Sequence, residues 1–152
     1  MRGGLGVYRS IGSEIARPHF LALLAEALGA EGQADEGLAL LAEAHAAVEA
    51  SGDRYIEAEI HRLRGRLLVM QSPGAAPEGI KSIQRALEVA RGQSARGWEL
   101  RAAMELCALE DANPAAAASR STLEQAYRSF SEGFDTRDLR TARDMLEMSC
   151  SS

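Results

Sequence analysis

The chain has 152 residues, enough for one domain with a hydrophobic core or for a short array of repeats. Hydrophobic residues make up 46% of the sequence, aromatic residues only 5%, and the formal net charge is −5. Because the arginines alternate with glutamates in an acidic chain, this charge pattern argues against binding to nucleic acid or to an anionic membrane surface.

No segment approaches the ~20 apolar residues of a membrane-spanning helix, and the amino terminus lacks the apolar core of a signal peptide. The two cysteines, Cys107 and Cys150, lie far apart and form no CxxC motif. We therefore expect a cytoplasmic protein.

Apolar residues recur at helical spacing along almost the whole chain, and no long stretch alternates apolar and polar residues. The pattern predicts an all-α fold without a sheet. The predicted helices span residues 13–29, 53–70, 77–91, 95–110, 115–130 and 136–148. One more helix, before residue 51, carries the apolar stripe Leu38, Leu41, Ala44, His45 and Val48. We expect a core that includes Leu24, Leu28, Leu41, Leu63, Leu68, Ile83, Leu87, Leu106 and Leu123.

The breaks between these helices carry residues that end or begin helices. Gly52 suits a left-handed helix end, and Asp53 and Ser94 are candidate amino-terminal caps. Pro77 and Pro114 suit a first helical turn. Connections this short predict antiparallel helical hairpins.

The stretch SEGFDTRDLRTARDML, residues 131–146, could be either a metal or phosphate site or only the start of a helix. Asp135 and Asp138 could bind a metal or a phosphate, but two carboxylates three residues apart are too few, and no EF-hand loop is present. We predict that Asp135 caps the last helix by accepting from the Asp138 amide, with Phe134 packed on Leu139 and Gly133 at the turn.

Small residues recur at intervals of roughly forty residues, which indicates internal repeats. Each repeat consists of two helices, and the small residues let these helices pack closely. The matching small positions are Ala25, Gly65 and Ala108 in the first helices, and Gly37, Gly79 and Ser119, followed by Ala44, Ala86 and Ala126, in the second.

This pattern resembles the tetratricopeptide repeat in its longer form. The resemblance implies a single domain over 1–152, a right-handed superhelix of antiparallel hairpins. Its repeats would be 13–50, 53–91 and 95–130, with a capping helix at 136–148. Solenoids need such a cap because the last hairpin otherwise exposes an apolar face.

A narrower resemblance rests on four stretches in order, which begin at Arg17, Asp53, Ala95 and Glu132. Together they look like the carboxy-terminal helical region of large bacterial signalling proteins, in which a nucleotide-cyclase or DNA-binding domain and an NTPase module precede such repeats. This resemblance implies either the regulatory tail of an adenylate or guanylate cyclase or signalling ATPase, or a free-standing relative of one.

No residue pattern supports catalysis, a cofactor or a metal. The sequence has no HExxH motif, no GxSxG elbow and no dinucleotide-binding loop. The pairs His45 and Glu49, and Glu57 and His61, have the spacing of ordinary helix-surface partners. We therefore expect a protein that is not an enzyme.

The remaining candidate site is the inner face of the array, which the first helix of each hairpin lines. We expect this face to form a groove for a protein or peptide partner of mixed charge. The charged and polar residues expected to point into the groove are His19, Glu26, Glu59, Arg62, Arg66 and Glu105, and Ala22 and Ala102 are expected to point the same way. A merely solvated face is the alternative.

The two ends of the array differ. The last helix caps one end, whereas residues 1–12 match only the tail of a preceding hairpin. We therefore expect the amino-terminal end either to self-associate as a homodimer or to pack on a further upstream hairpin.

Overall fold

The computed structural model describes residues 16–110 and 116–148 of the chain, and within these residues every regular element is a helix. The described helices are α2 (Arg17–Ala30), α3 (Ala34–Ser51), α4 (Glu57–Gln71), the short 3-10 helix η1 (Pro73–Ala75), α5 (Ala76–Gly92), α6 (Arg96–Glu110), α7 (Ala116–Arg128) and α8 (Arg137–Met148). The predicted all-α class is confirmed. The expected helix start at residue 13, segment 1–12, Pro114 and Cys150 lie outside the described residues.

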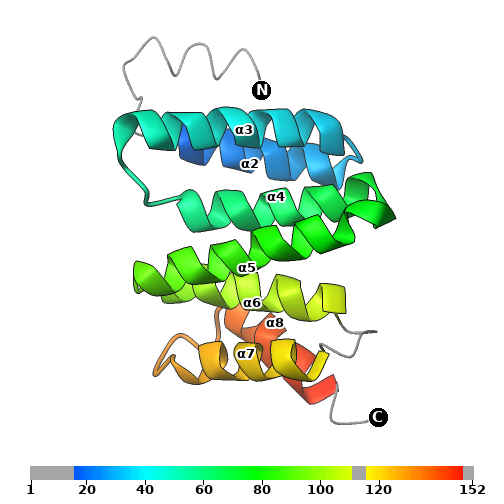
Figure 1. Ribbon diagram of the computed structural model, residues 1–152. Coiled ribbons are helices and arrows are strands. Elements are labelled where there is room, and N and C mark those ends of the chain that lie inside the picture. The colour runs from blue at the N-terminus through cyan, green and yellow to red at the C-terminus, as the bar shows by residue number, and fades with distance from the viewer. Residues whose placement is uncertain (1–15, 111–115, 149–152) are drawn as a thin grey trace.

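Neighbouring helices in the chain pack against each other in a layered stack. In Figure 1, α2 and α3 lie at one end, α7 and α8 at the other, and α4, α5 and α6 between them. Helix α4 also contacts α2 and α6, and α8 contacts both α6 and α7. The even-numbered helices α2, α4, α6 and α8 therefore adjoin one another along one side of the stack.

The core divides into two larger clusters. One joins α2, α3 and α4 through residues such as Leu21, Leu41 and Leu63. The other joins α5, α6, α7 and α8 through residues such as Leu100, Leu123 and Leu139. Eight of the nine leucine and isoleucine side chains predicted as core are buried; Leu28 is only partly buried.

Small residues let the helices approach closely, as the sequence predicted. A Cβ atom on Gly65 of α4 would lie 2.5 Å from the carbonyl oxygen of Gly79 in α5, and one on Gly37 would lie 2.7 Å from Leu67. Ala25 and Ser119 are also buried, but Ala108 is exposed and does not mediate close packing. Contact of α4 with α5 thus depends on the absence of two side chains.

Helix ends follow local backbone chemistry. Gly52 ends α3 in the left-handed conformation with φ 74°, as predicted. Ser94 also adopts positive φ, and the amides of Ser94 and Ala95 donate to Arg91 and Ala90, so Ser94 ends α5 instead of beginning α6 as predicted.

Two other helix starts differ from the prediction. Helix α4 begins at Glu57 instead of residue 53, because the Asp53 carboxylate accepts from the Tyr55 amide and holds a turn. The predicted Asp135 cap is wrong: the Thr136 hydroxyl accepts from the Leu139 amide at 3.5 Å.

Gly133, with φ 77°, forms the turn that precedes α8, as expected. Phe134 is 41% exposed, and its ring lies against that of Tyr127, with the ring centroids 5.7 Å apart. The 131–146 stretch is therefore a helix start, but one residue later than predicted.

Candidate functional site

A polar groove lies along the side of the stack formed by α2, α4, α6 and α8. Its main cavity has a volume of about 450 Å³ and is bounded by charged residues of all four helices. Met104, Ala108 and Met145 add an apolar wall at the α6–α8 end. This face combines ionic and apolar surface, which is the composition that peptide-binding grooves use.

Arg62 of α4 lies at the centre of an ionic cluster beneath this groove. Its guanidinium donates to both carboxylate oxygens of Glu59 at 2.9 and 2.7 Å, to Glu105 of α6 at 2.8 Å and to Glu26 of α2 at 3.4 Å. The side chains of Arg62 and Glu59 are 4% and 5% exposed. Three helices are therefore linked through one buried cation.

Arg101 of α6 is the second cation of the cluster. It lies 2.8 Å from Glu59, 3.6 Å from Glu26 and 3.9 Å from Asp138 of α8. Its guanidinium carbon also lies 5.7 Å from the centroid of the Trp98 ring, within range of a cation–π interaction. Arg101 thus connects the buried carboxylate of Glu59 with the last helix.

The positive charge of Arg62 is balanced by the carboxylates around it. Burial lowers the pKa of Arg62, but the hydrogen bond and charge of Glu59, with the charges of Glu105 and Glu26, outweigh burial and raise the pKa above its ordinary value. The role of Arg62 is to hold the helices of the groove in register.

An aromatic end adjoins the ionic cluster. Trp98 lies at the start of α6, and the Tyr55 ring packs edge-on to it at a centroid distance of 6.3 Å. Trp98 borders two smaller hollows, one shared with His19 and Leu23 of α2 and one shared with Tyr55. Since Leu23 and Tyr55 are exposed large hydrophobic residues, this end offers apolar contact area.

The structure brings five of the six predicted groove residues around the main cavity or its ionic cluster, and His19 lines the adjoining aromatic hollow. The expectation that Glu59 and Arg62 face a partner is wrong, because these side chains are buried and bonded to each other. Ala22 and Ala102 are also buried. Arg66 is 46% exposed and lies 4.0 Å from Glu105, so it remains accessible on the rim.

Sequence reasoning missed Arg101, Asp138 and the two methionines of the groove. Arg101 precedes the predicted inward position Ala102 by one residue, and its long side chain reaches Glu59 of the neighbouring helix α4. Asp138 was weighed as a metal or phosphate ligand and then interpreted as part of a helix start. The clue available in the sequence was the spacing of Arg137 and Thr141, which are four residues apart and so share a helix face; both line the cavity with Asp138.

A second group of polar residues gathers away from the groove. His45 of α3 lies beside Glu57 and His61 of α4, and these three residues form the only group of metal-ligand type found in the part of the chain that the structure describes. The sequence placed each histidine with a glutamate of its own helix and did not join the two helices.

Among residues 16–110 and 116–148, no helix combines the length and the apolar composition needed to cross a bilayer. Comparisons with known proteins found no match to the chain among family models, curated proteins or solved structures.

Proposed function

We propose that this chain is a non-enzymatic protein-interaction module of the tetratricopeptide type, with α2/α3, α4/α5 and α6/α7 as three hairpins of a right-handed superhelix and α8 as its cap. Two contact patterns support this proposal. Helix α4 packs on both α2 and α6, as inner helices of successive hairpins do, and α8 packs on α6 and α7 where a further inner helix would lie.

The groove across α2, α4, α6 and α8 is the observation that carries the functional proposal. Its base is fixed by the buried Arg62 cluster, so the groove is preformed and a ligand loses little affinity to ordering it. Its rim keeps Arg66 and Arg137 exposed, next to the apolar Met104 and Met145. We propose a peptide ligand that places an apolar side chain on the methionines and a carboxylate near Arg66.

The test uses peptides selected from a displayed random library on the purified chain. Trp98 is the single tryptophan, and its ring lies 5.7 Å from the guanidinium of Arg101, which lines the groove, so its fluorescence reports binding without a label. Selected peptides should carry an acidic residue near an apolar one and should bind at least about tenfold more weakly to Arg66→Glu, a loss of ~1.4 kcal/mol.

Arg128→Glu is the matched control, because Arg128 is an exposed arginine of α7 paired only locally with Glu124 at 2.6 Å. Peptide affinity should be the same for this variant and for the unaltered chain. A selection that yields no binder, or binders that Arg66→Glu and Arg128→Glu weaken equally, contradicts the proposal.

A further inference from the structure

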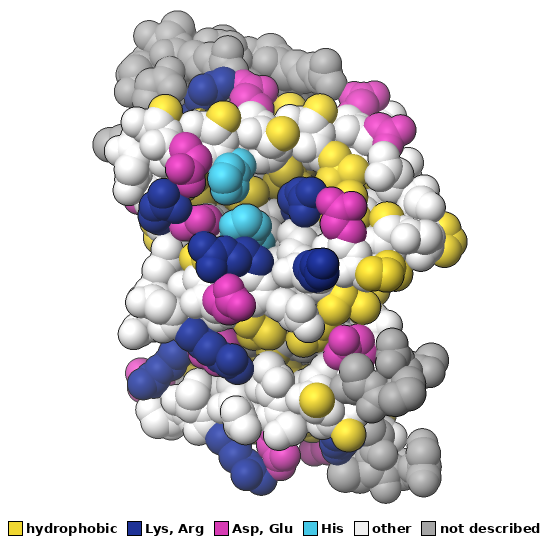
Figure 2. Space-filling view, viewed as in Figure 1, with side chains coloured by type: hydrophobic (Ala, Val, Ile, Leu, Met, Phe, Trp, Pro, Cys, Tyr) yellow, Lys and Arg dark blue, Asp and Glu magenta, His cyan; other side chains and the backbone are white. Residues whose placement is uncertain are grey.

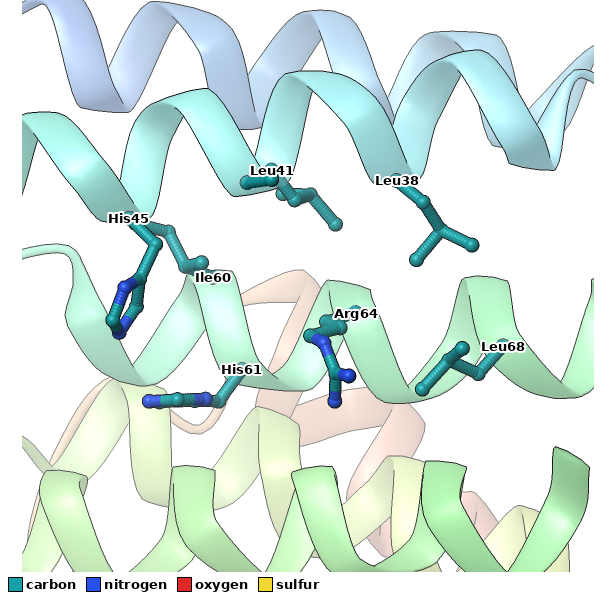
Figure 3. Close-up of a pocket in the computed structure, with 8 residues that line it drawn as sticks. Leu38, Leu41, His45, Ile60, His61, Arg64 and Leu68 are labelled. Carbon is teal, nitrogen blue, oxygen red and sulfur yellow. The ribbon is translucent and has the colours of Figure 1, made fainter.

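Helices α3 and α4 carry a three-residue polar cluster of His45, Glu57 and His61, whose two histidines are labelled in Figure 3. His45 of α3 points toward α4, where Glu57 and His61 lie one helical turn apart. The His45 and His61 rings meet edge to face with their centroids 5.5 Å apart. The face shown in Figure 2 carries two histidine side chains close to each other, among arginines and acidic residues. One ligand atom from each of the three residues lies within 4.8 Å of the other two.

We propose that His45, Glu57 and His61 form a binding site for a divalent transition-metal ion of the Zn²⁺ class. Two imidazoles and one carboxylate are a ligand set that zinc accepts in three-ligand sites. In tetrahedral zinc the ligand atoms are about 3.3 Å apart, from bonds of ~2.0–2.1 Å. His61 Nε2 lies 3.8 Å from Glu57 Oε1, which is close to this separation, so this pair needs little movement to bind an ion.

The ligand side chains are partly withdrawn from solvent. Glu57 is buried, and the His61 side chain is 17% exposed. A carboxylate oxygen of Glu57 lies within 4.8 Å of a nitrogen of each ring.

Arg54 is the competitor that an incoming cation must displace. Its Nη1 atom donates to both carboxylate oxygens of Glu57 at 3.0 and 3.1 Å. Arg54 is half exposed, and its Nη2 atom lies 3.1 Å from Glu49 on α3. Arg54 can therefore keep an acidic partner when Glu57 turns toward a metal, which keeps the cost of displacement low.

A cavity of about 510 Å³ adjoins the two histidines and leaves one side of the cluster open. Its walls are apolar, from Leu38, Leu41, Ile60 and Leu68, with Arg64 at its edge (Figure 3). Three protein ligands and an open side are the arrangement of zinc sites that keep an exchangeable fourth position. Water would complete the coordination.

The test is titration of the metal-free full chain with Co²⁺, which reports tetrahedral coordination through its visible absorption, followed by competition with Zn²⁺. We expect one equivalent of Co²⁺ to bind with tetrahedral spectra and Zn²⁺ to displace it. His45→Ala, His61→Ala and Glu57→Gln should each weaken binding by at least about tenfold. Arg54→Ala should strengthen binding, because it removes the cation that occupies Glu57.

The third histidine provides the matched control. His19 lies on α2 beside the groove, so His19→Ala should leave Co²⁺ binding unchanged. Far-UV circular dichroism checks that each variant is folded, and the Arg54→Ala result does not depend on loss of structure. The proposal is overturned if no Co²⁺ binds at 1:1 stoichiometry, if the histidine variants bind normally, or if a thiolate-to-cobalt band assigns the metal to a cysteine.

Discussion

Helix α4 carries charged residues on two sides, and the two sets differ in how many ion-pair and hydrogen-bond partners they have. Toward α2 and α6, Glu59 and Arg62 are buried and bonded to each other and to further charges. Toward α3, Glu57 and His61 meet His45 beside an apolar cavity, with Arg54 as the carboxylate partner.

The difference separates a structural ion cluster from a site. A fully paired buried cluster fixes helix positions but has no capacity left for a ligand, so only its exposed rim can bind. A cluster of potential ligands beside open volume retains that capacity. Charged residues on one helix therefore need to be judged by their partners across the packing interface.

The largest expected effect comes from removing the central cation. Arg62→Ala leaves Glu59 and Glu105 short of a buried partner, so the free energy of unfolding should fall by about 3–5 kcal/mol. Urea denaturation followed by circular dichroism measures it. Arg66→Ala, on the rim of the same groove, should change stability by no more than ~0.5 kcal/mol. Equal effects from the two variants would show that the buried cluster has no special structural role.

Removal of the last helix should be the next largest effect. Helix α8 buries Leu139 and Ala142 against α6 and α7 and contributes Asp138 to the groove. Deleting residues 134–152 should cost about 2 kcal/mol and lower Tm by ~4–8 °C. An unchanged Tm in differential scanning calorimetry would mean that α8 does not stabilise the stack.

The close contact of α4 with α5 holds α4 in place and so affects both of its charged sides. A glycine-to-alanine substitution, which adds one methyl group, tests this contact. Gly65→Ala would place a Cβ 2.5 Å from the Gly79 carbonyl oxygen and from Ile83, and should destabilise by about 1–3 kcal/mol. Gly97→Ala, in α6, meets nothing within 4 Å and should stabilise by up to ~1 kcal/mol. Chemical denaturation of the pair checks the opposite signs, and a shared sign contradicts the packing.

The smallest expected effect is a pH dependence of folding stability, caused by His61 on the side of α4 that faces α3. Burial and His45 lower the pKa of His61, with Arg85 and Arg64 adding to this and Glu57 opposing it. The folded state then binds a proton less readily than the unfolded state. Stability should be full above the unfolded pKa of ~6.5 and should decrease as pH falls below that value and through the folded pKa.

His61→Gln should flatten this dependence in thermal melts recorded from pH 8 to pH 5, without metal. The same slope in both proteins would show that His61 does not titrate differently in the two states.

Much of the fold was predictable because its determinants are local. Helical periodicity, the left-handed end at Gly52 and the small residues Gly37, Gly65 and Gly79 located the helices and their close contacts. The error at Ser94 arose because a short polar side chain suits either end of a helix, and the backbone conformation decides which. The error at Asp135 arose because Asp135 and its neighbour Thr136 are both suitable caps, and the structure uses Thr136.

The sequence by itself determined which residues share a face of each helix, and it therefore identified Glu59, Arg62 and Arg66 as one stripe. Tertiary packing decided which members of that stripe are buried, because Arg101 and Glu105 approach Glu59 and Arg62 from α6. Packing also brought His45 to Glu57 and His61. Helical spacing relates residues three or four apart, whereas the rotation and depth at which α3 meets α4 depend on the whole interface between them.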